Sequence, residues 1–424
     1  MSRSVGATRT GHLRCCFGAV DRLRVLGPPG WVAVLFRVLF GSGGGAMAHG
    51  EVRLTTTASG HPAWLVSDHG TVRRLLTDPR LDVYHEDPAG APRCFESGPF
   101  GPPQQWTPDA AEDHLRMRRL VGRSMSARRL AGLRPRIQAI VDGLLDDLAA
   151  APPPADFHRL VSAPLPPLVL RELFGVPDDE GTDFDGWLYD AISDHDPGRM
   201  VRGFTGLSAY VGTLVRRRID EPRGDVPTDL AAAHTEDPEY WTMERLTGAA
   251  CLILLAGVGP TMDAIDDSLV RLSADADQWA AVREDPALVE NAVEELLRLS
   301  AITAAGTQTP FGIPRWAATD VTVDGTTIRK GEMVLLDIHA ANHDERHIEA
   351  PHRLDVHRSG KTALIFGAGA HYCLGAPLAR MQLGILFHAL IGRFPAMRLA
   401  VPPSRIRPRD PRLAVGSAEL PVAW

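Results

Sequence analysis

The stretch Phe366-Gly-Ala-Gly-Ala-His-Tyr-Cys-Leu-Gly-Ala-Pro-Leu-Ala-Arg380 is the most informative part of this 424-residue chain. It combines a cysteine with glycines at short intervals, and apolar residues then recur with helical spacing from Leu374 to Ile385. Because Cys373 directly precedes this helix, its sulfur is expected at a helix N-terminus, where free N–H groups and the helix dipole stabilise negative charge. The sequence therefore predicts a cysteine that can act as a thiolate.

Three kinds of site compete for this stretch. Gly367 and Gly369 begin a dinucleotide-binding G-x-G-x-x-G pattern, but Tyr372 occupies the position of the third glycine. A zinc site would use His371 and Cys373, but no second Cys or His pair follows at finger or ribbon spacing. A thiolate that binds haem iron uses every element, since glycines let the backbone pass close to a flat ring and an aromatic residue shields the sulfur from water.

The stretch resembles the haem-binding signature of the cytochrome P450 family, and the resemblance extends from about residue 62 to the end of the chain. It implies the P450 fold, which is mainly α with a smaller β part and forms a single haem-centred domain. It also implies haem b as the cofactor and Cys373 as the iron ligand. Phe366, Gly367, His371 and Gly375 are the corresponding cofactor-binding residues in this stretch.

Three further residues resemble the family's partners of the haem propionates. His114 and Arg118 are four residues apart and share one helix face, a pattern that alone is typical of a solvated basic surface. Arg315 ends the segment Gly312-Ile-Pro-Arg. Together with His371 they would supply the donors that two carboxylates on a buried cofactor need. The chain departs from the family at Ala363, where many relatives carry a histidine.

Another resemblance concerns a buried network of one glutamate and two arginines. In Glu295-Leu-Leu-Arg298 an acid and a base are three residues apart, which alone indicates a common helix-stabilising pair. The later segment Pro351-His-Arg-Leu-Asp355 resembles the family's meander before the cysteine loop. We therefore expect Glu295, Arg298 and Arg353 to form a structural network, in which loss of one member leaves a buried charge unpaired.

The distal helix, expected from about Leu246 to Leu272, carries the largest departure. Relatives typically read Ala-Gly-x-acid-Thr where this chain reads Ala256-Gly-Val-Gly-Pro-Thr261. Ala256 and Gly257 therefore match the family, whereas Gly259 replaces the acid and Pro260 replaces the alcohol.

This replacement affects the predicted catalytic site. In the family the acid and alcohol supply protons for oxygen chemistry. Thr261 cannot substitute simply, because one step along a helix rotates a side chain by about 100°. Pro260 is expected to kink the helix. Two explanations stay open: either water or a substrate hydroxyl supplies the protons, or the enzyme uses peroxide or performs coupling, dehydration or rearrangement.

Composition limits the remaining classes. A hydrophobic content of 44% supports a large core, and a net charge of −7 argues against a nucleic-acid-binding protein. The few cysteines are too sparse for a disulfide framework and indicate a reducing compartment, so we expect a cytoplasmic protein. They are Cys15, Cys16, Cys94, Cys251 and Cys373.

Residues 1–46 differ from the rest, which we expect to form the catalytic domain from 47 to 424. This segment holds six arginines and a single acid, Asp21, which leaves −12 for the remainder. Its apolar run from Trp31 to Phe40 is broken by Arg37 and is shorter than the roughly 20 residues that span a bilayer. We interpret it as a disordered or mis-assigned extension, with Met47 as a candidate start and a targeting segment as the third alternative.

Local patterns predict further elements. Pro62–Val66 is expected to be a strand, and Asp324-Gly325 marks a hairpin between strands at 320–325 and 326–338. Helices are expected near 130–148, 210–218, 246–272 and 286–299.

The resemblance implies substrate contacts from the loop Val83–Thr107, the region Phe204–Tyr210, the distal helix and the segment Ala301–Thr309. We expect a monooxygenase that acts on a small, functionalised metabolite, with electrons from ferredoxin and its reductase, because the chain has no flavin or iron–sulfur module. A non-catalytic recruitment domain of the same fold is the alternative from another class.

Overall fold

The computed structural model describes residues 52–94, 103–105, 107, 109–192, 196–300, 312–360, 363–407 and 417–424. The expectations for residues 1–46 and for the segment Ala301–Thr309 lie outside this part of the chain, and those for Val83–Thr107 lie partly outside it. The described residues confirm a single domain that is mainly α with a smaller β part.

Several helices begin at residues whose side chains accept hydrogen bonds from free backbone N–H groups. Asp225 accepts from the Thr228 N–H before α9, and Thr242 accepts from the Arg245 N–H before α10. The α-helices are α3 (His69–Leu75), α4 (Ala110–Ser124), α5 (Ala127–Ala150), α6 (Leu165–Phe174), α7 (Gly181–Ala191), α8 (Pro197–Asp220), α9 (Val226–Glu236), α10 (Met243–Ala274), α11 (Ala276–Glu284), α12 (Val289–Leu299), α13 (Ile338–Asn342) and α14 (Ala376–Arg393).

The strands form one five-stranded sheet and three small ones. The main sheet has the order β1-β2-β10-β7-β3, in which β10 runs parallel to β2 and antiparallel to β7. The strands are β1 (Arg53–Thr56), β2 (Pro62–Val66), β3 (Leu81–Asp82), β4 (Tyr84–His85), β5 (Gln104–Gln105), β6 (Ala155–Asp156), β7 (Ile313–Ala317), β8 (Val321–Val323), β9 (Thr326–Ile328), β10 (Met333–Leu336), β11 (Arg398–Leu399) and β12 (Pro421–Ala423).

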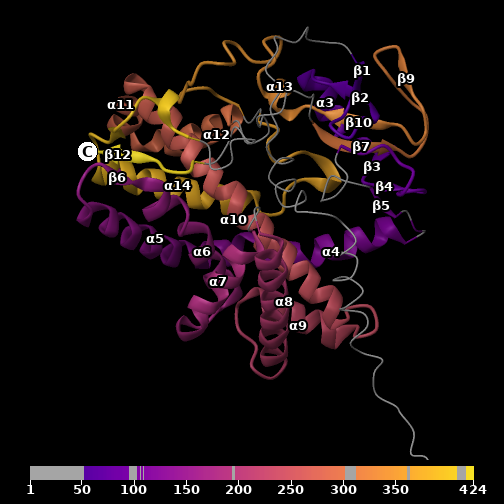
Figure 1. The fold of residues 1–424 in the computed structure, drawn as a ribbon, viewed down its shortest axis with the longest axis horizontal. Coiled ribbons are helices and arrows are strands. Elements are labelled where there is room, and N and C mark those ends of the chain that lie inside the picture. The colour runs from indigo at the N-terminus through magenta and orange to yellow at the C-terminus, as the bar shows by residue number, and fades with distance from the viewer. Residues whose placement is uncertain are drawn as a thin grey trace, which may run out of the picture.

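Helices and the main sheet occupy different sides of the molecule. Figure 1 shows the sheet with α3 on one side, the helices α5, α6, α11, α12 and α14 on the other, and α10 running through the middle. The largest apolar cluster joins residues of α5, α6, α10, α12 and α14, whereas a second cluster lies between the sheet and α3. The α10 helix is therefore the central element around which a site can be built.

The hairpin prediction is correct, but the strand after it is shorter than expected. Asp324 and Gly325 both have positive φ values, 47° and 82°, as a tight turn between β8 and β9 requires. The single strand expected over 326–338 is instead β9, then β10, and then the start of α13. Gly331, with φ 84°, lies in the turn that separates the two strands.

Within the described part of the chain, α10 is also the helix that is long and apolar enough to cross a membrane. Its most apolar stretch is 61% buried inside the molecule, so burial in the protein core accounts for its composition.

Candidate active site

Cys373 lies at the start of α14, two residues before the N-cap Gly375. Its backbone N–H donates to the Phe366 carbonyl at 2.9 Å and so closes the preceding loop. Gly367 and Gly369 have φ values of 71° and 69°, a conformation that favours glycine. The loop therefore holds Phe366 and Cys373 opposite each other, with the cysteine facing the free N–H groups of α14.

The thiol experiences opposing influences. Cys373 is accessible, but crowding by protein atoms raises the pKa of its thiol through desolvation. Hydrogen bonds from the Gly375 and Ala376 N–H groups, and the charges of Arg118 and Arg380, act to lower that pKa. The helix N-terminus thus stabilises the Cys373 thiolate as predicted, but this effect on the thiol pKa is smaller than the opposing effect of desolvation. Coordination to a metal ion would complete the deprotonation of the thiol.

A cationic cluster lies beside the cysteine loop. His114 and His371 pack with their ring centroids 4.4 Å apart, and Arg118 donates to the Tyr372 carbonyl at 2.9 Å. Burial, together with the charges of His371 and Arg118, lowers the pKa of His114 to about 4. His371 Nε2 is 3.7 Å from the nearest oxygen of Asp82, a carboxylate that the sequence did not single out.

Arg315 completes this cluster from β7. Its side chain is buried, and its Nη1 donates to the Pro314 carbonyl at 2.9 Å. Burial lowers the pKa of Arg315 to about 10, although the negative charge of Asp82 opposes this change. Within the part of the chain that the structure describes, Arg315 has no ion-pair partner within 4 Å, so its buried charge lacks a carboxylate at contact distance.

These donors fit haem b. The cluster offers two guanidinium groups, of which that of Arg315 is buried, and two imidazoles as hydrogen-bond donors to a group with two carboxylates, and an accessible thiol lies next to it. The four residues are His114, Arg118, Arg315 and His371. A thiolate is a ligand of haem iron, and guanidinium groups bind carboxylates with charge-assisted hydrogen bonds. The residues present therefore match both chemical ends of the cofactor.

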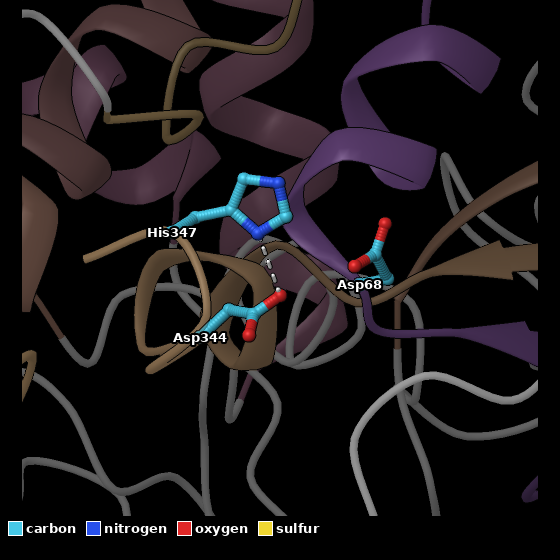
Figure 2. Close-up of side chains that lie close together, drawn as sticks. All are labelled: Asp68, Asp344 and His347. Carbon is cyan, nitrogen blue, oxygen red and sulfur yellow. Dashed lines mark hydrogen bonds and ion pairs between the residues drawn. The ribbon is translucent and has the colours of Figure 1, made fainter.

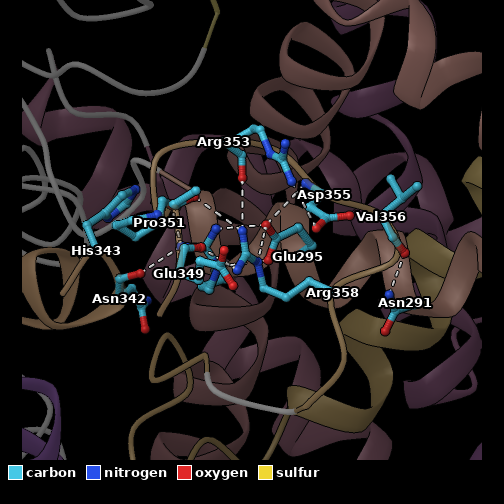
Figure 3. A network of polar contacts seen from close by, with 12 residues as sticks. Asn291, Glu295, Asn342, His343, Glu349, Pro351, Arg353, Asp355, Val356 and Arg358 are labelled. Atoms are coloured by element: carbon cyan, nitrogen blue, oxygen red, sulfur yellow. Dashed lines mark hydrogen bonds and ion pairs between the residues drawn. The ribbon is translucent and has the colours of Figure 1, made fainter. Parts of the chain in front are cut away.

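The glutamate and arginine network lies between α12 and the segment after α13 (Figure 3). Glu295 and Arg298 of α12 are both buried, and Arg298 donates to the two carboxylate oxygens at 2.7 and 2.8 Å. Arg298 also donates to the carbonyls of Asn342 and Pro351, each at 2.7 Å. The network therefore ties α12 to the segment after α13.

The prediction that Arg353 completes the network is wrong. The Arg353 side chain is 71% exposed and lies 3.5 Å from Asp355, and only its backbone carbonyl meets the network. The third member is Arg358, which donates to Glu295 at 2.9 Å and to the Glu349 carbonyl at 2.7 Å. Arg358 follows Arg353 in the same irregular segment, and the path of that segment turns Arg358 inward and leaves the Arg353 side chain exposed.

The distal helix α10 continues through Pro260. Because proline has no N–H, the Ala256 carbonyl lacks its usual helical donor. Ala256 is accessible, whereas Gly259 and Thr261 are buried, so Thr261 points away from the face on which Ala256 lies. Gly257 packs on α6, where an added Cβ would lie 3.3 Å from the Leu170 side chain.

A second group of ligand-type side chains lies at the start of α3, formed by Asp68, Asp344 and His347 (Figure 2). Arg346 already donates to both carboxylates, at 2.7 Å to Asp68 and 2.9 Å to Asp344. Although burial opposes ionisation, hydrogen bonds from Arg346 and the His69 amide hold the pKa of Asp344 well below its usual range. This cluster is a crosslink between the start of α3 and the segment after α13, in which one arginine bridges two carboxylates.

The fold and this site define a class of mainly α protein in which an accessible cysteine at a helix N-terminus lies beside a cluster of two arginines and two histidines. The family model for cytochrome P450 matches residues 231–421. Nocardicin C N-oxygenase from Nocardia uniformis subsp. tsuyamanensis is 36% identical, over 86% of this chain and 90% of the relative. Mycinamicin IV hydroxylase/epoxidase from Micromonospora griseorubida is 34% identical, over 89% and 94%.

Similar solved structures are also cytochrome P450s. The substrate-free cytochrome P450 PimD, a polyene macrolide antibiotic pimaricin epoxidase, aligns with a TM-score of 0.77 and 33% identity, over 88% of this chain and 93% of that one. The chain therefore belongs to the cytochrome P450 family. It is a P450 monooxygenase with haem as its cofactor.

Proposed function

We propose that this P450 oxidises a functionalised small molecule of secondary metabolism in the cytoplasm, with electrons from ferredoxin and its reductase. The observation that carries the proposal is the accessible Cys373 at the start of α14 beside a cluster of two arginines and two histidines. Relatives named for nocardicin and mycinamicin oxidation support the substrate class. When bound, haem supplies the iron that activates oxygen for transfer to the substrate.

In this proposal the residues of this chain have three roles, which are to bind the iron, to bind the propionates and to hold the cysteine loop in place. Cys373 provides the sulfur ligand, and Phe366, Gly367 and Gly375 shape the loop around it. The guanidinium groups of Arg118 and Arg315 and the imidazoles of His114 and His371 donate hydrogen bonds to the propionates and so fix the orientation of the ring. Glu295 and Arg298, with Arg358, hold the segment before the cysteine loop against α12.

The substrate contacts α10 on its accessible face in this proposal. Leu252 is 66% exposed, and Ala256 lies one turn further along the same face. Phe204 of α8, from the region that the resemblance implies, is 41% exposed. An apolar face with a nearby aromatic residue suits a medium-sized substrate with a largely apolar body.

The thiolate assignment is tested by absorption spectroscopy of the reduced, carbon monoxide-treated protein. The wild type is expected to show the long-wavelength Soret band of a thiolate-ligated complex, and Cys373→Ser is expected to lose it. Cys94→Ala is the matched control, because Cys94 is buried and its pKa is raised to about 12 by desolvation. A wild type that folds and binds haem without this band would overturn the proposal.

The Gly259-Pro260 pair supports a second candidate function, in which the enzyme uses peroxide or performs coupling, dehydration or rearrangement. The buried Gly259 offers no carboxylate, and Pro260 offers no hydroxyl. The test compares turnover with ferredoxin, its reductase and dioxygen against turnover with peroxide alone. Faster turnover with the protein donors favours the first function, and turnover on peroxide alone favours the second.

A further inference from the structure

An arginine lies over the aromatic ring that flanks the cysteine. The Cζ atom of Arg380, on α14, is 4.5 Å from the centroid of the Phe366 ring, within the range of a cation–π contact. Its Nη1 donates to the Tyr372 hydroxyl at 2.9 Å, and its Nε and Nη2 both donate to Glu294 of α12. Three partners therefore fix the orientation of one guanidinium beside the cysteine loop.

The same loop is held from its other side by α4. Arg118 donates to the Tyr372 carbonyl, while Arg380 donates to the hydroxyl of the same residue. Tyr372 directly precedes Cys373 in the chain, and the two guanidinium groups are hydrogen-bonded to its carbonyl and its hydroxyl. Two positive charges are therefore fixed at the residue directly before the sulfur ligand.

The two arginines differ in whether a carboxylate compensates their positive charge. Arg380 has a bidentate carboxylate partner in Glu294, with the Nη2 to Oε2 distance at 3.1 Å, whereas Arg118 has no ion pair within 4 Å among the described residues. Glu294 is adjacent to Glu295 on α12, and the two carboxylates bind different arginines because neighbouring helix positions point about 100° apart. The same helix thus anchors the structural network and the ion pair next to the sulfur.

We propose that Arg380 is a positioning residue that sets how strongly the Cys373 sulfur donates electrons, and that Glu294 adjusts this effect by compensating the Arg380 charge. The inference rests on the proposed function, in which Cys373 binds the haem iron. Reduction adds negative charge to the metal and its ligand, so a nearby cation favours the reduced form and a nearby anion favours the oxidised form. Charge at Arg380 and Glu294 therefore controls the reduction potential.

The test measures the haem midpoint potential of substrate-free, haem-loaded protein by equilibrium titration. Glu294→Gln leaves the Arg380 charge uncompensated and is expected to raise the potential. Arg380→Gln removes the cation, leaves Glu294 ionised and is expected to lower it. The double variant is expected to lie between the two single variants. Because both side chains are partly exposed, each shift should shrink at high ionic strength.

Arg393→Gln is the matched control. It removes a guanidinium from the same helix, where Arg393 pairs with Asp146 about 20 Å further along. Opposite shifts of the two single variants, both larger than the control shift, support the proposal. Shifts of the same sign, or none beyond that of Arg393→Gln, overturn it. If Arg380→Gln binds no haem, the potential of Glu294→Gln alone decides: a rise supports the proposal, and a fall or no change overturns it. A wild type without the thiolate band refutes the proposed function instead.

Discussion

Replacing Arg358 by alanine tests which arginine completes the network between α12 and the segment after α13. The Arg358 side chain is 14% exposed, and it donates to the buried Glu295 at 2.9 Å and to the Glu349 carbonyl at 2.7 Å. A hydrogen bond to a charged group contributes about 1.5–3 kcal/mol, and Glu295 keeps Arg298 as a partner. We therefore expect Arg358→Ala to lower the free energy of unfolding by about 3 kcal/mol.

Arg353→Ala is the matched control from the same segment. Its side chain is 71% exposed, and the ion pair with Asp355 is 3.5 Å long. Exposed pairs of this kind contribute little, so the change should stay within about 0.5 kcal/mol. Nothing else distinguishes the two substitutions chemically, since both replace arginine by alanine.

The assay is urea denaturation of the haem-loaded proteins, followed by haem absorbance and by far-UV circular dichroism. With a slope of about 3 kcal/mol per molar urea, the Arg358→Ala midpoint should fall by about 1 M and the Arg353→Ala midpoint should hardly move. Haem content after purification should fall for Arg358→Ala alone. Equal midpoints for the two variants would refute the assignment of Arg358 to the network.

Three further predictions follow from buried groups. Arg315→Met should speed haem loss to apomyoglobin at least about tenfold, as removal of about 1.4 kcal/mol of binding implies; an unchanged rate would contradict the propionate role. Burial lowers the pKa of His343 to about 4 and that of His339 to about 3, so the unfolded chain binds protons first as the pH falls below about 6.5. Each histidine should cost about 2 kcal/mol of stability between about pH 7.5 and about pH 5, and His343→Gln should reduce the loss seen in urea titrations. Pro260→Ala should raise the free energy of unfolding by about 1 kcal/mol, since it restores an N–H donor to the Ala256 carbonyl, and the urea midpoint should rise accordingly; a lower midpoint would show that proline is required there.

Local patterns predicted the elements whose chemistry is set by neighbours in the chain. The strand Pro62–Val66 and the turn at Asp324-Gly325 occur where the sequence indicated them. The start of α14 after Cys373 was also evident, because apolar spacing and glycines identify a helix that begins at a loop. Hydrogen bonds and φ values that act over a few residues are sufficient for such features.

Contacts between distant segments needed the tertiary structure. The sequence pattern led to Arg353, and only the path of the chain turns Arg358 toward Glu295, 63 residues away. The same holds for Arg380, whose contact with Phe366 and Glu294 no local pattern indicated.

The sequence by itself determined the class of this protein, because the cysteine loop is a contiguous stretch whose residues serve one cofactor. The tertiary structure decided which charges surround that loop. The reason is physical: a buried charge is stable only beside a partner, and partners from different helices meet only when those helices have packed.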